Sequence, residues 1–147
     1  MKIIVAILAL IVAVNVSCQS QNLKADSALI REAALNYVEG FYRGDTARMA
    51  KSMSRELVKR IIDNRSGKSK LMNTNLAELQ KFALGQKPQD PNPGTPFRGS
   101  VIIYDISSDV ALAKITTNKM TRFFDYVQMG KMDGQWKVIN VLWAFYK

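Results

Sequence analysis

Residues 122–145 read RFFDYVQMGKMDGQWKVINVLWAF, two runs of β-branched and aromatic residues on either side of the short segment 132–135. The dipeptide Asp133-Gly134 between such runs is the strongest short-range signal of a β-hairpin, because a type I′ turn requires positive φ at both of its central residues. The second run ends in VLWAF, which is too apolar for a strand with one face in water. This stretch therefore predicts the central hairpin of a curved sheet, with other elements packed on its concave side.

The rest of the chain predicts helices first and strands afterwards. Helices are expected over residues 26–43, 45–53 and 74–85, where apolar side chains recur at helical spacing. The first of these helices is expected to be capped by Asp26 or Ser27. Strands are expected over residues 97–106, 110–117, 122–131 and 135–145. Helices followed by an antiparallel meander predict an α+β domain, with the helices on one face of a strongly bent sheet.

Residues 57–62 are compatible with two structures. Their apolar positions continue the helical spacing, yet the β-branched residues among them favour a strand. Residues 64–68 resemble a turn, so we expect a short hairpin formed by residues 56–63 and 68–73. All four prolines lie within residues 86–96, which are expected to form an extended loop.

The N-terminal segment differs in composition from everything that follows. Residues 3–14 are an unbroken apolar run of 12 residues behind Lys2. Such a run is too short for a membrane span and is typical of a secretory signal. We expect residues 1–17 to be a signal peptide, residues 18–25 a polar tether and residues 26–147 the folded domain. The protein is then exported, to the periplasm or outer membrane as a lipoprotein, and otherwise secreted.

The single cysteine, Cys18, follows Val16 and Ser17, where a bacterial lipoprotein signal places its acylated residue. Asn15 stands where such signals prefer an aliphatic residue, so more than one outcome is open. Cys18 either is acylated and anchors the protein to a membrane, or leaves with the signal peptide, or remains an unpaired thiol. In each case the mature chain has no intramolecular disulfide.

Composition excludes several function classes. The chain has 21 basic and 12 acidic residues, a formal net charge of +9, and no histidine. Nine of the basic residues lie between Arg43 and Lys70; they suit an anionic membrane surface or acidic ligand, although a solvated helix face and hairpin explain them better. The export signal and the lack of a recognition motif argue against nucleic acid. Without histidine, the usual nucleophile systems and zinc or iron sites are excluded, so neither metal nor cofactor is expected.

The order of elements, together with several short motifs, resembles the nuclear transport factor 2-like (SnoaL-like) superfamily, and most closely its branch of putative lumazine-binding proteins. The most specific motif is KMDGQWKVINVLW at residues 131–143. The other motifs are Tyr37-Val38-Glu39-Gly40 with Gly44-Asp45, Glu56-Leu57-Val58-Lys59-Arg60, Ala111-Leu112-Ala113-Lys114 and Asp125-Tyr126. The resemblance covers about residues 27–145. It implies a cone-shaped fold, in which three N-terminal helices pack on a strongly curved antiparallel sheet with a pocket at its wide end.

One departure from this branch bears on function. Its members commonly have a His-Pro pair where this chain has Ser54-Arg55. Any family chemistry that depends on that imidazole is absent here, and related dehydratases and cyclases with a His–Asp dyad are poor guides for the same reason.

Asp125 is the candidate catalytic residue. Strand alternation places it on the same side as Phe123, Val127 and Met129. Burial of a carboxylate on an apolar face raises its pKa, which suits a general base, and ketosteroid isomerases of the resembled fold use an aspartate in this way. The alternative, which we favour, is a structural role: a hydrogen bond to a backbone amide or tyrosine, or a pair with an arginine such as Arg122.

A pocket lined by aromatic residues with few polar groups would suit a small, flat aromatic or apolar ligand. The candidate lining residues are Tyr37, Phe41, Tyr104, Tyr126, Trp136, Asn140 and Trp143. We therefore expect a non-catalytic ligand-binding or interaction protein of the cell envelope; the alternative is an isomerase- or dehydratase-like enzyme that uses Asp125 as its base. The outer face of the C-terminal sheet, rich in apolar residues, predicts a homodimer.

Overall fold

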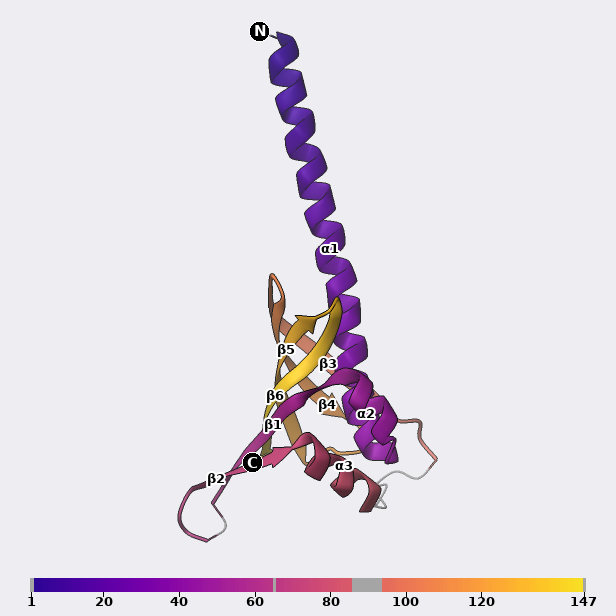
Figure 1. Cartoon of the computed structure of the whole chain (residues 1–147), viewed down its shortest axis with the longest axis vertical. Helices are drawn as coiled ribbons and strands as arrows, with labels where there is room; N and C mark the ends of the chain where they lie inside the picture. The colour runs from indigo at the N-terminus through magenta and orange to yellow at the C-terminus, as the bar shows by residue number, and fades with distance from the viewer. Residues whose placement is uncertain (1, 65, 86–93, 147) are drawn as a thin grey trace.

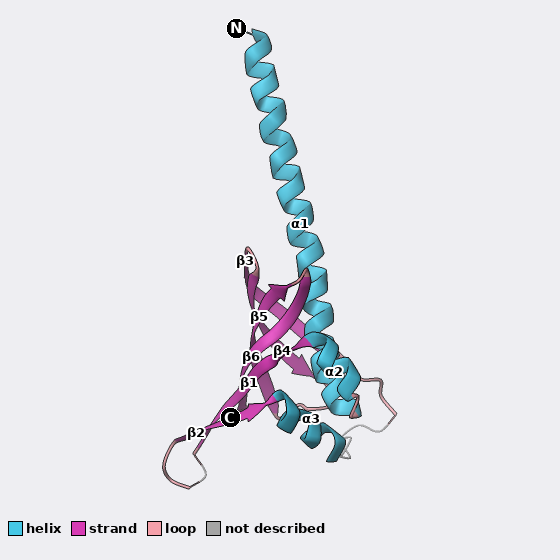
Figure 2. Ribbon diagram, in the orientation of Figure 1, coloured by secondary structure: helices cyan, strands magenta, loops and turns pink. Residues whose placement is uncertain are grey.

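The computed structural model describes residues 2–64, 66–85 and 94–146, with side chains from residue 22 onward. In this part of the chain, three helices lie on one side of a six-stranded sheet (Figures 1 and 2). The elements are α1 (Lys2–Arg43), α2 (Thr46–Ser52), β1 (Met53–Asp63), β2 (Lys70–Asn75), α3 (Leu76–Gly85), β3 (Gly99–Ser107), β4 (Val110–Thr117), β5 (Phe123–Met132) and β6 (Gln135–Phe145).

The sheet has the strand order β2-β1-β6-β5-β4-β3, so the predicted C-terminal hairpin forms its central pair. Asp133 and Gly134 connect β5 and β6 with φ angles of 50° and 75°, as the predicted turn requires. All neighbours described are antiparallel except β1 and β6, which run parallel. The expected α+β fold is confirmed, with a sheet that is mixed because β1 lies beside β6.

The short hairpin predicted between the helices is also confirmed. β1 begins at Met53, directly after α2, so this residue belongs to a strand and not to the end of the second helix. Asp45 caps α2 by accepting a hydrogen bond from the backbone N–H of Arg48. At the start of α3, Asn75 and Glu78 accept reciprocal hydrogen bonds from each other's backbone N–H groups, which is a capping box.

The first helix is longer than predicted. It runs from Lys2 to Arg43 without a break, because residues 18–25, expected as a tether, include neither proline nor glycine. Asp26 consequently lies inside the helix and does not cap it. No helix in the described part of the chain is long and apolar enough to cross a membrane. Most of the predicted loop 86–96 falls outside the described residues.

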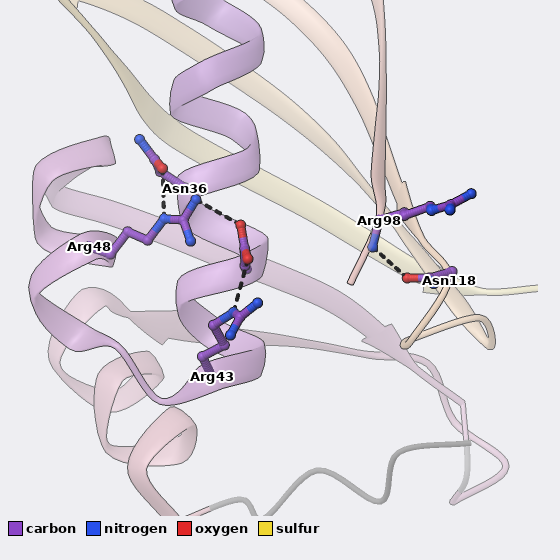
Figure 3. A network of polar contacts seen from close by, with 6 residues as sticks. Asn36, Arg43, Arg48, Arg98 and Asn118 are labelled. Carbon is purple, nitrogen blue, oxygen red and sulfur yellow. Dashed lines mark hydrogen bonds and ion pairs between the residues drawn. The ribbon is translucent and has the colours of Figure 1, made fainter. Parts of the chain in front are cut away.

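Contacts between α1 and α2 explain the role of the motif Tyr37-Val38-Glu39-Gly40. Glu39 accepts from the guanidinium groups of Arg43 and Arg48, at 2.9 and 2.7 Å, and Arg48 also donates to Asn36 (Figure 3). Gly40 has no side chain where the helices meet: a Cβ there would lie 2.9 Å from Cγ of Met49. The motif therefore positions helices, and its one charged residue, Glu39, is paired with two arginines.

Candidate functional site

A cavity of about 640 Å³ lies where the C-terminal end of α1, helix α3 and the loop before β5 meet the sheet. Its volume is in the range of small-molecule sites. Figure 2 shows α3 beside the end of the sheet that carries β1 and β2. The lining residues are Phe41, Tyr42, Lys59, Thr74, Leu79, Phe82, Lys119, Met120, Thr121, Arg122, Phe123, Trp143 and Phe145.

Lys59 forms the floor of the cavity and is bound from behind by two buried groups. Its Nζ lies 2.8 Å from Oδ1 of Asp125 and 2.6 Å from Oη of Tyr37. The Tyr37 hydroxyl donates to Oδ2 of Asp125 at 2.7 Å. The three side chains come from β1, β5 and α1, and each is at most 9% exposed. The arrangement is a closed triangle in which each residue contacts the other two.

Burial dominates the electrostatics of this triangle. Burial, together with the charge of Asp125, raises the pKa of Tyr37 well above its ordinary value of 10.0, so the hydroxyl keeps its proton. Burial also lowers the pKa of Lys59 below 10.5, while the charge of Asp125 and its hydrogen bond oppose that shift. The carboxylate is thus the group that keeps a buried amine charged.

Three aromatic rings lie near the Lys59 amine, and two of them, Phe123 and Trp143, belong to the cavity wall. Its Nζ lies 5.2 Å from the centroid of Trp143, 5.4 Å from that of Tyr37 and 6.0 Å from that of Phe123. These distances allow cation–π attraction, which stabilises an ammonium ion. Phe123, Trp143 and Phe145 also contact one another with their rings tilted or edge to face. The floor is therefore a cation held within an aromatic wall.

The structure brings together part of the predicted site. Phe41 and Trp143 line the cavity. Tyr37 and Asp125 lie beneath it, in contact with Lys59, and neither is among the lining residues. The partners of Asp125 are a tyrosine, which was among the alternatives that the sequence left open, and a lysine in place of the arginine suggested there. Arg122 lies in the cavity wall.

The other four candidate pocket residues lie away from this cavity. Tyr104 and Tyr126 are exposed on the opposite face of the sheet, with ring centroids 6.2 Å apart, because alternation along β5 turns Tyr126 away from Asp125. Asn140 is on that same face and contacts Gln128 and Arg60. Trp136 is buried near the β5–β6 turn and donates to Asp26.

Lys59 was missed by the sequence analysis, although a signal for it exists. Alternation along β1 places Lys59 on the same face as Leu57, which is 1% exposed. A lysine on the apolar face of a strand is unusual. The ambiguity between helix and strand at residues 57–62 concealed this pattern.

Asp26 ties α1 to the central hairpin. Its Oδ1 accepts from Nε1 of Trp136 and from Nζ of Lys131, each at 2.9 Å. The hydrogen bond from Trp136, followed by that from Lys131, lowers the pKa of Asp26 below its ordinary value of 3.8. The resulting stability is therefore fully present above that value and is lost as the pH falls through the lower pKa of the folded state.

We expect the wild-type protein to lose stability as the pH falls below 3.8, and Asp26→Asn to show a smaller loss over the same interval. Urea unfolding at several pH values between neutral and the acid limit measures both. Asp109→Asn, which removes an exposed carboxylate, is the matched control and should keep the wild-type dependence. If the free energy of unfolding depends on pH in the same way for wild type and Asp26→Asn, the lowered pKa of Asp26 is contradicted.

No group of three or more potential metal ligands occurs among the residues that the structure describes. The cavity lining offers two buried lysines, Lys59 and Lys119, the exposed Arg122, two threonines and several aromatic rings.

The fold and the cavity define a protein of the nuclear transport factor 2-like class, with helices on the concave face of a curved sheet. Residues 25–144 match the family described as "Putative lumazine-binding", and the chain belongs to this family. No curated protein matches the chain in sequence.

Solved structures support the same fold. A nuclear transport factor 2-like protein of unknown function from Shewanella baltica is 21% identical, with a TM-score of 0.70 over 84% of this chain and 95% of that one. A scytalone dehydratase, described as putative, from Novosphingobium aromaticivorans is 15% identical, with a TM-score of 0.59 over 88% and 89%. A ketosteroid isomerase-like protein from Erwinia carotovora atroseptica is 15% identical, with a TM-score of 0.56 over 82% and 95%. At these identities the likeness concerns the fold alone.

Proposed function

We propose that this protein binds a small, flat and largely apolar molecule in the cavity and does not transform it. The observation that carries the proposal is the position of Asp125. It is the carboxylate that a general base would require, yet it lies behind Lys59 and only the lysine reaches the cavity.

Three further features support binding without catalysis. Both oxygens of Asp125 already accept hydrogen bonds, from Tyr37 and Lys59, and the residue is 3% exposed. A base in this position would first have to lose its ion pair with the lysine. The described lining contains no carboxylate, and the chain has no histidine.

The alternative, an isomerase- or dehydratase-like enzyme, is favoured by one observation. The Tyr37 hydroxyl lies 2.7 Å from Asp125, as an electrophilic partner beside a base would. In the binding proposal the same hydroxyl completes the hydrogen bonding of a buried carboxylate. The substitution of Asp125 treated in the Discussion separates the two.

The test of binding is native mass spectrometry of protein purified from its own host, together with titration of lumazine, the pteridine that the family's description names. We expect a retained small molecule, or saturable binding of lumazine, that is lost in Trp143→Ala because this ring is part of the cavity wall. Leu142→Ala, which removes an exposed side chain next to it in sequence, is the matched control. Absence of any ligand in both assays would contradict the proposal.

We also propose that the protein is exported to the cell envelope and anchored through Cys18. The apolar segment at residues 3–14 and the position of the cysteine behind it support this. The mass of the native N-terminus is expected to show that residues 1–17 are absent and that Cys18 is acylated. Cys18→Ser should then move the protein out of the membrane fraction and leave its folding unchanged. Intact Met1 on host-expressed mature protein would end the export proposal.

A homodimer through the outer face of the sheet is the remaining proposal. Ile102, Tyr104, Leu112, Tyr126 and Leu142 are all exposed there, on the neighbouring strands β3–β6. Light scattering at micromolar concentration should give the mass of two chains.

Leu142→Lys should shift that mass to one chain, because it would place a charge within the apolar contact. Leu84→Lys, at an exposed apolar residue of α3, should not. A strictly monomeric wild-type protein would count against the dimer.

A further inference from the structure

Among the described residues, the Lys59 ammonium has acceptors for two of its three hydrogens. An ammonium group has three N–H donors. The structure gives this one two acceptors, Oδ1 of Asp125 and Oη of Tyr37, and no third acceptor among the described residues. Because both acceptors lie behind the lysine and its side chain lines the cavity, an acceptor atom of a ligand can complete its hydrogen bonding.

The charge of the cavity wall has one sign. Lys59 and Arg122 contribute positive charges to the cavity wall, and the described lining includes no aspartate or glutamate. Asp125 beneath the floor offsets the charge of Lys59, and the exposed guanidinium of Arg122 leaves the wall positive. Field lines in a cleft with low-dielectric walls are concentrated, so such a site attracts anions and repels cations.

The apolar walls determine what kind of anion would fit. Phe41, Phe82, Phe123, Trp143 and Phe145 offer ring faces and edges around a volume of about 640 Å³. Such walls exclude a small hydrated anion, which would lose water without compensation, and favour a flat ring system. The acceptor at the end of that ring system would meet the amine, and the rings would meet the walls.

We propose that the ligand is an aromatic anion whose carboxylate or ionised ring oxygen binds the Lys59 ammonium, with Arg122 at the rim. The inference rests on the proposed binding function and specifies the chemical class of its ligand. Lys59 is then the residue that selects the ligand, and the pair with Asp125 keeps it charged and pointed at the cavity.

The test compares three probes with one ring system and different charge by isothermal titration at pH 7 and physiological salt. They are naphthalene-2-carboxylate, 2-naphthamide and (naphthalen-2-yl)trimethylammonium. We expect the carboxylate to bind about tenfold more tightly than the amide, because a hydrogen bond between two charged groups exceeds one to a neutral acceptor by about one factor of ten in affinity. The trimethylammonium compound should not bind measurably.

Two variants identify the residues that cause the preference for the carboxylate over the amide. The double variant Lys59→Met/Asp125→Asn removes the pair without changing net charge. It should bind the amide as the wild type does, while its preference for the carboxylate should fall from about tenfold to the roughly threefold that Arg122 contributes. Arg122→Gln should lower the affinity for the carboxylate probe by about threefold, which is the effect of one exposed charge. Arg55→Gln, which removes one charge from an exposed residue outside the cavity lining, is its matched control. It should leave the ratio of carboxylate affinity to amide affinity unchanged.

Each outcome decides a different point. Equal binding of carboxylate and amide overturns the inference and leaves the proposed function standing. A preference that stays at the full tenfold in the double variant also overturns it, since the Lys59–Asp125 pair would then not be its cause. If the double variant does not fold, Arg122→Gln and Arg55→Gln are compared instead. The inference is overturned if both variants have the same ratio of carboxylate affinity to amide affinity. Failure of all three probes to bind would contradict the proposed function of the cavity as well.

Discussion

Replacing Asp125 with asparagine is expected to lower the free energy of unfolding by about 3–5 kcal/mol, because it removes one partner of a buried ion pair. The amide keeps the shape of the carboxylate but removes its charge. In the wild-type protein the Lys59 ammonium lies 2.8 Å from a carboxylate oxygen, and in the variant it has no counter-ion. The Tyr37 hydroxyl would also exchange a charged acceptor for a neutral one. Thermal and urea unfolding at pH 7 measure the loss.

The enzymatic alternative predicts the opposite sign for this variant. A carboxylate held in an apolar site for catalysis is costly to stability, so its neutral isostere would leave the midpoint unchanged or raise it. Asp109→Asn, at an exposed position, is the control and should lie within about 0.5 kcal/mol of the wild type. An unchanged or raised midpoint for Asp125→Asn would overturn the preference for binding without catalysis.

Lys59→Met should destabilise the protein to a similar extent, about 3–5 kcal/mol, because the carboxylate of Asp125 would remain buried with no cation beside it. Methionine fills much of the volume of the lysine stem and keeps its contacts with the surrounding rings. The loss of free energy of unfolding is therefore caused by the unpaired charge of Asp125 and not by an empty space left in the core. Lys81→Met, at an exposed position of α3, is the matched control.

The double variant Lys59→Met/Asp125→Asn tests the coupling directly. Buried ion pairs can often be replaced by uncharged side chains of similar shape at small cost, so it should be less destabilised than the sum of the single variants by about 1–3 kcal/mol. Unfolding midpoints for the four proteins complete the cycle. Strict additivity would show that Lys59 and Asp125 do not act as a pair.

Most of the secondary structure followed from short-range patterns. The turn at Asp133-Gly134 needs positive φ at two adjacent residues, and few dipeptides other than Asp-Gly supply it. Asn75 and Glu78 form a cap from a spacing of three residues. The start of α1 was misplaced at Asp26, because an aspartate suits a cap equally well in sequence whether or not the helix continues through it.

Asp26 also shows why a local motif does not specify its partner. The side chain that was expected to cap a helix accepts instead from Trp136, 110 residues away, and from Lys131. Trp136, expected in the pocket, is thereby held near the opposite end of the hairpin from Trp143. Two tryptophans of the same strand thus have separate roles, although their sequence surroundings are equally apolar.

By itself, the sequence determined the central hairpin, the α+β order and the inward face of Asp125, because turn geometry and strand alternation depend on neighbouring residues. It could not determine what Asp125 contacts. Its partners Tyr37 and Lys59 lie 88 and 66 residues away, and Lys59 reaches it only because β1 joins β6 in parallel and shares the concave face with β5. That juxtaposition arises from the strand order of the whole sheet, so only the tertiary structure decided that a lysine, and not the carboxylate, faces the cavity.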